Sequence, residues 1–157
     1  MATTATPKTR AIATPGTGVG TARYHLYRMA YGRIKGAMDD GYYLEAITLI
    51  ESIVSDRLES RITKLLGTDF SFKTLGALIN KSKSVETDAS LSALVQTDLD
   101  DWRQLRNEAL HAMAKLANGD SSTWEDRMLA LVLIAEDGIQ VLKAIDSRCT
   151  ALRKAGI

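Results

Sequence analysis

Apolar residues recur along most of this chain at spacings of three and four, which is the period of an amphipathic α-helix. The first such stripe begins at Tyr24 and ends before Gly41, and a second, longer stripe ends before Gly67. Glycine often follows the last turn of a helix because it readily adopts a left-handed backbone conformation. No alternation typical of a strand interrupts this pattern. The pattern predicts helices at residues 24–39, 42–66, 72–82, 97–117 and 122–154.

Capping signals set the expected starts of the last two helices. Thr97 is followed by three acidic residues, which favours Thr97 as an N-cap because the helix dipole stabilises negative charge in the first turn. The sequence Ser122–Glu125 has the form of a capping box. The run Met128–Ala135 is apolar on nearly every side, which is typical of the most buried helix of a bundle. Residues 84–96 are expected to form a loop or a partly helical connector.

These elements predict an all-α fold, an up-and-down bundle of about five helices in one domain at residues 23–157. Residues 1–22 are mostly Thr, Ala, Gly and Pro, with no acidic residue. Such a composition buries too little apolar surface to offset the entropy of ordering. We therefore expect residues 1–22 to be a disordered tail.

Charge and cysteine content narrow the class of protein. The formal net charge is +1, so a preference for a polyanion must come from local patches. No apolar run approaches the roughly 20 residues that cross a bilayer. The single cysteine, Cys149, has no intramolecular disulfide partner and is expected to be a small buried hydrophobic residue. These features predict a cytoplasmic protein that does not enter the membrane, and they indicate neither a metal nor a cofactor.

The sequence has two histidines, and His111 is the candidate for chemistry. It lies one helical turn after Asn107, on the same face of the predicted helix. Arg106 is long enough to bring its guanidinium beside the imidazole. Histidine transfers protons near neutral pH, and arginine stabilises charge that develops on a phosphate. These groups suffice for RNA cleavage without a metal, although a solvated helix face explains them equally well. His25, the other histidine, is expected at the surface.

Further polar residues extend this candidate site. Arg103 and Gln104 flank the catalytic candidates on the same helix, and we expect both to contact substrate. Arg28 and Arg33 lie among tyrosines on the first helix, and basic groups beside aromatic rings suit single-stranded RNA. The same tyrosine stripe is also typical of a packing face or a dimer interface. Glu51, on the second helix, is a candidate to orient the catalytic groups across the bundle.

The sequence from Arg106 to His111, Arg-Asn-Glu-Ala-Leu-His, resembles the signature of the HEPN superfamily. That signature is an arginine, a polar residue that is often asparagine, a few further positions and a histidine. The context is similar too, since a long helix with Tyr42–Ile47 comes early and the motif lies in the next-to-last long helix. The resemblance covers about residues 24–155.

The resemblance implies a helical bundle whose dimer brings both motifs to one cleft. It implies a metal-independent endoribonuclease, of a kind that often serves as a toxin or in defence against phage, with an antitoxin or regulatory protein as a further partner. Arg106 and His111 would be catalytic and Asn107 a polar support. Because one motif supplies one histidine and one arginine, we predict a homodimer that binds RNA.

Two other functions fit the same residues. A non-catalytic helical interaction module would leave Arg106 and His111 apart or engaged in local ion pairs. An RNA- or nucleotide-binding domain would keep the cleft without cleaving its ligand. An active ribonuclease requires the two side chains to lie close together and to be reached by solvent.

Overall fold

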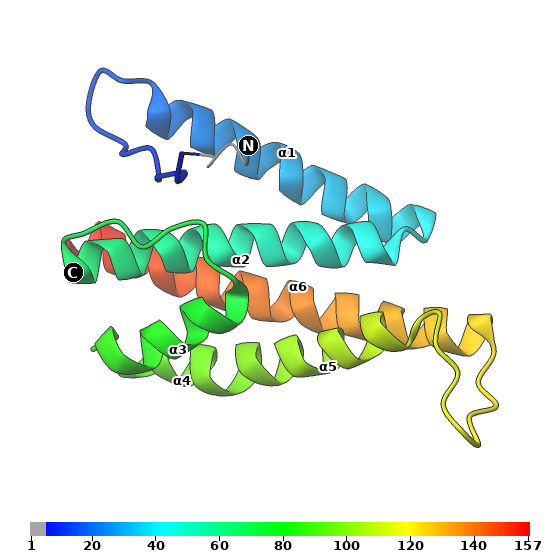
Figure 1. The fold of residues 1–157 in the computed structure, drawn as a ribbon. Coiled ribbons are helices and arrows are strands. Elements are labelled where there is room, and N and C mark those ends of the chain that lie inside the picture. Colours follow the sequence, from blue (N-terminus) through cyan, green and yellow to red (C-terminus); the bar gives the residue numbers. More distant parts are fainter. Residues whose placement is uncertain (1–5) are drawn as a thin grey trace, which may run out of the picture.

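The computed structural model describes residues 6–157, and these form an all-helical bundle (Figure 1). Because α4, the π-helical turn η1 and α5 run on without a break, the described chain has five helical rods. The prediction of an all-α bundle of about five helices is confirmed. The elements are α1 (Val19–Asp40), α2 (Tyr43–Leu66), α3 (Leu75–Val85), α4 (Ala89–Leu94), η1 (Val95–Leu99), α5 (Asp100–Ala112) and α6 (Trp124–Lys154).

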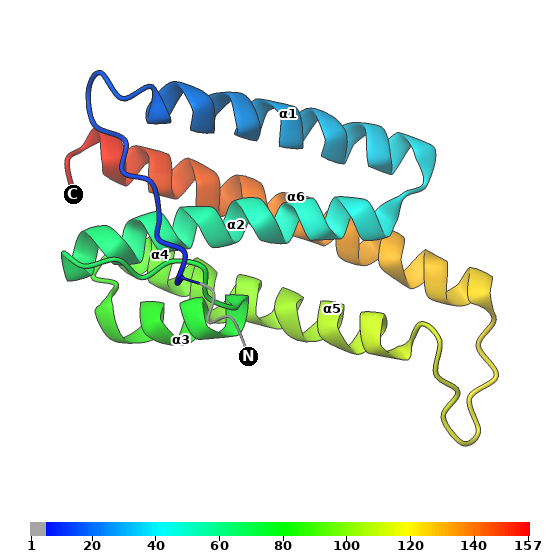
Figure 2. The ribbon, with the colours of Figure 1, turned by 45° about the horizontal axis from the view of Figure 1, so that its top comes forward.

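The helices form three layers, with α2 and α6 in the middle. Figures 1 and 2 both show α1 on one side of this pair and the α3–α5 segment on the other. Nine residues of α2 are buried, which makes α2 the centre of the core. None of the described helices is long and apolar enough to cross a membrane.

The expectation that α6 is the most buried helix is wrong for its first half. Leu131 and Ala135 are fully buried, whereas Leu129 is 63% exposed and Leu133 is 58% exposed. The neighbouring helices cover only one side of this part of α6. Its outer side is therefore an apolar surface without a partner in a single chain.

The helix that carries the motif begins earlier than predicted. Thr97 does not cap a helix, because its hydroxyl donates to the carbonyl of Ala93 within a continuing helix, at 2.6 Å. Asp88 is the N-cap instead and accepts the backbone N–H of Leu91 at 2.8 Å. The Asp88 carboxylate also binds the Arg148 guanidinium of α6 (Nε to Oδ1, 2.9 Å). A contact with a distant helix therefore sets this boundary, and most of residues 84–96 is helical.

Other boundaries shift by a few residues. Thr74 caps α3, which spans 75–85 rather than 72–82. The capping box of α6 pairs Thr123 with Asp126, one residue later than expected on both sides. The motif helix ends at Ala112 rather than at residue 117. Finally, α1 begins at Val19, so residues 19–22 are helical where a disordered tail was expected.

Candidate functional site

Trp102 anchors the motif helix to the bundle. Its side chain is buried, and its indole Nε1 donates to the carbonyl of Ile134 in α6 at 2.8 Å. The ring lies directly over Gly138, where a Cβ atom would come within 2.7–2.9 Å of three ring atoms. Glycine at this position lets α5 approach α6 closely, and this contact fixes the position of the residues that follow Trp102.

Arg106 reaches from α5 to α2, where its Nη2 lies 2.8 Å from Oε1 of Glu51 in an ion pair. The guanidinium carbon lies 5.8 Å from the centre of the Trp102 ring, within the range of a cation–π contact. The Arg106 side chain is only 13% exposed, and its Nε is buried without a hydrogen-bond partner. The expected role of Glu51 as a partner across the bundle is therefore supported by the structure.

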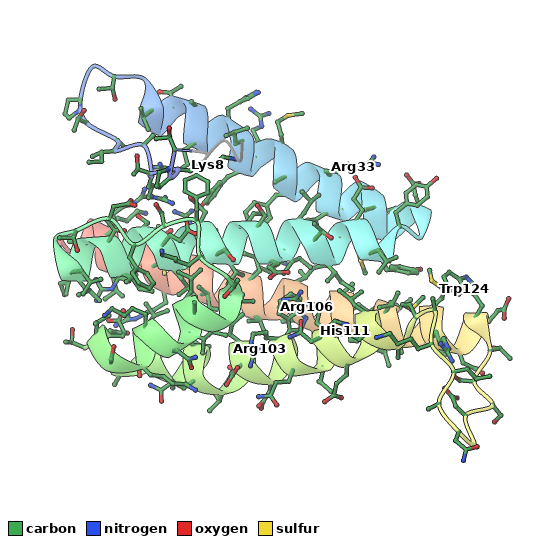
Figure 3. The ribbon with its side chains drawn as sticks, in the orientation of Figure 1. Lys8, Arg33, Arg103, Arg106, His111 and Trp124 are labelled. Atoms are coloured by element: carbon green, nitrogen blue, oxygen red, sulfur yellow. The ribbon has the colours of Figure 1, made fainter. Side chains whose placement is uncertain are left out.

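His111 is exposed and lies in the last turn of α5. Successive residues of an α-helix are about 100° apart, so His111 is rotated by about 140° from Arg106. Asn107 is half-buried one turn before His111, and Gln104 is exposed. Figure 3 labels Arg103, Arg106 and His111 along α5. Within one chain, the catalytic candidates share a helix but not a face of it.

Arg127, at the start of α6, holds the end of the motif helix. Its Nη1 donates to the carbonyl of Ala112, to that of Met113 at 3.1 Å and to that of Lys115 at 2.7 Å. Its Nη2 binds Asp120 at 3.0 Å. A positive charge stabilises the carbonyl end of a helix. Arg127 thus fixes the turn that carries His111, and nothing in the local sequence pattern identifies it for this role.

The remaining substrate-binding candidates are spread over two sides of the bundle. Arg103 pairs with Asp100 at 2.8 Å, next to the motif. Arg33 of α1 pairs with Glu45 of α2 at 2.7 Å, and Arg28 is exposed on α1. Figures 1 and 3 show α1 across the central layer from α5. Within a single chain, Arg28 and Arg33 therefore lie away from the motif.

Neither family models, curated proteins nor solved structures match this chain. Among residues 6–157, no three His, Cys, Asp or Glu side chains lie close enough together to hold a metal ion. The chemical groups at the motif are an imidazole, a paired guanidinium and an amide, which transfer protons and bind anions.

Proposed function

We propose that this chain is a metal-independent endoribonuclease that acts as a homodimer, with Arg106 and His111 as its catalytic residues. The exposed position of His111 on the motif helix carries the proposal, because a group that transfers protons must be reached by the substrate. An ion pair with Glu51 of α2 holds Arg106, in the same motif, in one orientation beside Trp102. The contact with Glu51 is made through Nη2, and an arginine held in this way stabilises negative charge on a phosphate.

A second copy supplies what one chain lacks. His111 and Arg106 point in different directions on α5, so one phosphate is served better by groups from two chains. Large apolar side chains near the motif are more than half exposed on α5 and α6, including Leu105, Leu129 and Leu133. Exposed apolar patches on soluble proteins often mark interfaces. Burying these leucines between two copies would bring the two motif helices close together.

The proposed reaction needs only these side chains and the RNA. The 2′-oxygen attacks the adjacent phosphorus, and His111 of one copy accepts the 2′-hydroxyl proton. Arg106 stabilises the negative charge of the pentacoordinate phosphorane. As the bond from phosphorus to the 5′-oxygen breaks, His111 of the second copy donates a proton to that oxygen. The products are a 2′,3′-cyclic phosphate and a free 5′-hydroxyl.

The test is cleavage of a mixed RNA substrate in EDTA by the purified protein. His111→Ala should lower the rate by about 10²–10⁴-fold, and Arg106→Ala by a comparable factor. His25→Ala and Arg153→Ala are matched controls, because both residues are exposed and lie on other helices. A requirement for Mg²⁺, or full activity of His111→Ala, would show that the mechanism is wrong. Light scattering that finds a monomer at micromolar concentration would contradict the dimer.

A role as a toxin or in phage defence follows the same proposal. Expression in a bacterial host should then inhibit growth, and an antitoxin or regulatory partner would relieve that inhibition. His111→Ala should remove the inhibition while the protein remains folded. Equal inhibition by the wild type and His111→Ala would contradict the catalytic role.

The second candidate function is a non-catalytic helical interaction module. The ion pair of Arg106 with Glu51 and its separation from His111 on α5 favour it, as does the low exposure of Arg106, because such an arginine also serves as a structural link between α5 and α2. In this case Arg106→Ala lowers stability, His111→Ala changes neither stability nor assembly, and no RNA is cleaved. Denaturation of the two variants, measured beside the cleavage assay, separates the two functions.

A further inference from the structure

A cavity of about 820 Å³ lies between the N-terminal segment, α1 and α2, away from the motif. Its volume falls within the range of about 300–1,000 Å³ that is usual for small-ligand sites. Leu26, Ile53 and Phe72 contribute apolar walls, and charged groups of α2 lie on one side. An apolar cavity with a few converging polar groups is the usual form of a binding site.

Two carboxylates of α2, Asp56 and Glu59, form the charged side of the cavity, and both contact Arg10. Arg10 binds Asp56 in a bidentate manner, through Nη1 to Oδ1 and through Nη2 to Oδ2 at 3.0 Å. Its Nη1 also lies 3.8 Å from Oε2 of Glu59. Tyr27 of α1 donates its hydroxyl to Asp56, and Arg23 lies 3.8 Å from the same carboxylate. The Arg10 side chain is only 9% exposed, and its guanidinium forms part of the cavity wall over Asp56.

Arg10 belongs to a segment that is otherwise weakly held. Of residues 6–18, which we call the N-terminal strap, Arg10 alone is not exposed. The other contacts of the strap are at its surface: Arg23 donates to the carbonyl of Ala11 at 2.7 Å, and Lys8 lies 6.0 Å from the ring of Phe72. Figure 3 labels Lys8 on the strap beside α2. The strap therefore docks mainly at Arg10, whose backbone N–H also donates to Oδ1 of Asp69 at 3.2 Å.

The pKa values of the two carboxylates are shifted in opposite directions. Burial by itself would raise the pKa of Asp56, but hydrogen bonds from Arg10 and Tyr27 outweigh burial and hold the pKa below its ordinary value. Burial raises the pKa of Glu59, although contacts with the Lys73 backbone and Arg10 oppose this. Asp56 is thus a charged acceptor while a guanidinium is bound to it.

We propose that Asp56, in the wall of this cavity, binds an alkylguanidinium group carried by another molecule, and that Arg10 occupies this carboxylate as a built-in competitor. The planar guanidinium matches the two oxygens of Asp56, which an ammonium group does not. The apolar walls accommodate the alkyl stem. Because the strap tethers Arg10 at a millimolar effective concentration, an outside ligand binds the wild type more weakly than a chain without Arg10.

The first experiment is calorimetric titration of the full chain with propylguanidinium, which has the stem and head group of an arginine side chain. Arg10→Ala should bind one molecule per chain, at least about tenfold more tightly than the wild type. Adding Asp56→Asn to Arg10→Ala should abolish binding. Arg153→Ala is the matched control, since it removes an exposed arginine outside the cavity; it should behave as the wild type does.

Three results would overturn the proposal: no saturable binding to Arg10→Ala, equal binding to the wild type and Arg10→Ala, or equal binding of propylammonium. A short peptide with one arginine between alanines identifies the source of the guanidinium. Tighter binding of this peptide than of propylguanidinium indicates an arginine of a protein partner. Equal or weaker binding of the peptide indicates a small guanidine, and both outcomes support the site.

A second measurement uses the wild type, so it does not depend on the folding of a variant. Thermolysin cleaves before apolar residues such as Ile12, next to the anchor of the strap. Saturating propylguanidinium should displace Arg10, release the strap and accelerate cleavage between Ala11 and Ile12. Propylammonium chloride at the same concentration should have no such effect. An unchanged cleavage rate with propylguanidinium would mean that the ligand does not compete with Arg10.

Discussion

Replacing Gly138 with alanine places a methyl group where the ring of Trp102 lies. The added Cβ would be 2.7 Å from the indole Nε1 and less than 3 Å from two ring carbons. Such distances are well inside van der Waals contact, and the ring has little room to move because Trp102 is buried. Either α5 moves away from α6, or the indole leaves its hydrogen bond to Ile134.

Two opposing effects set the size of the change. Alanine is favoured over glycine inside a helix by about 0.5–1 kcal/mol. Overpacking of a core costs about 1–3 kcal/mol, and loss of the indole hydrogen bond adds about 1 kcal/mol. The net expectation for Gly138→Ala is a loss of about 1–3 kcal/mol in the free energy of unfolding.

Gly32→Ala provides the matched control. Gly32 is also inside a helix, but nothing lies within 4 Å of the Cβ that would be added there. This variant should gain about 0.5–1 kcal/mol. Urea denaturation of the wild type and both variants, followed by circular dichroism, gives the two values. If Gly138→Ala is as stable as Gly32→Ala, the close contact between Trp102 and Gly138 does not position α5.

Three further changes test other contacts. Arg148 lowers the pKa of Asp88 to about 2 from an ordinary 3.8. The Asp88 carboxylate therefore stabilises the fold above about pH 4, and this stabilisation is lost as the pH falls toward 2. Asp88→Asn keeps an N-cap, and its free energy of unfolding should depend less on pH in this range. Burial raises the pKa of Cys149 to about 11, so its reaction with a disulfide reagent at pH 8 should be far slower in the native chain than in urea. Glu51→Gln leaves the motif arginine without its counter-charge and should cost about 1–3 kcal/mol in denaturation, whereas Glu136→Gln, at an exposed position of α6, should cost almost nothing.

The sequence predicts those parts of the fold that depend on local signals. Gly41 and Gly67 end α1 and α2 in the left-handed conformation, with φ of 79° and 69°, as the apolar stripes before them indicate. The start of the motif helix is different. Thr97 with its acidic neighbours has all the features of a cap, but Asp88 prevails because Arg148, sixty residues away, binds it. The capping preferences of neighbouring residues cannot predict a contact between residues so far apart in the sequence.

The same distinction holds for the candidate site. The motif on α5 and the carboxylate of Glu51 follow from helical spacing and from the length of an arginine. Arg127 and Arg10 do not, since each acts on backbone or side chains far away in the sequence. Arg10 also lies in a stretch whose composition favours disorder. The composition of residues 1–22 as a whole does not show that one of these side chains is buried. Single anchors of this kind emerge only from the assembled structure.

The π-helical turn η1 determines which way the side chains of α5 point, because α5 follows it directly. A π-turn holds one residue more than an α-turn, and each residue of an α-helix turns the chain by about 100°. Deleting the exposed Gln96 should restore a regular α-helix and rotate α5 relative to α4 by that angle. Leu91 and Leu99, on the two sides of this turn, are both fully buried. After the rotation only one of the two leucines could remain buried in the core. The extra residue in η1 therefore sets the rotation of α5 relative to α4. This rotation determines whether Arg106 points toward α2 or into solvent.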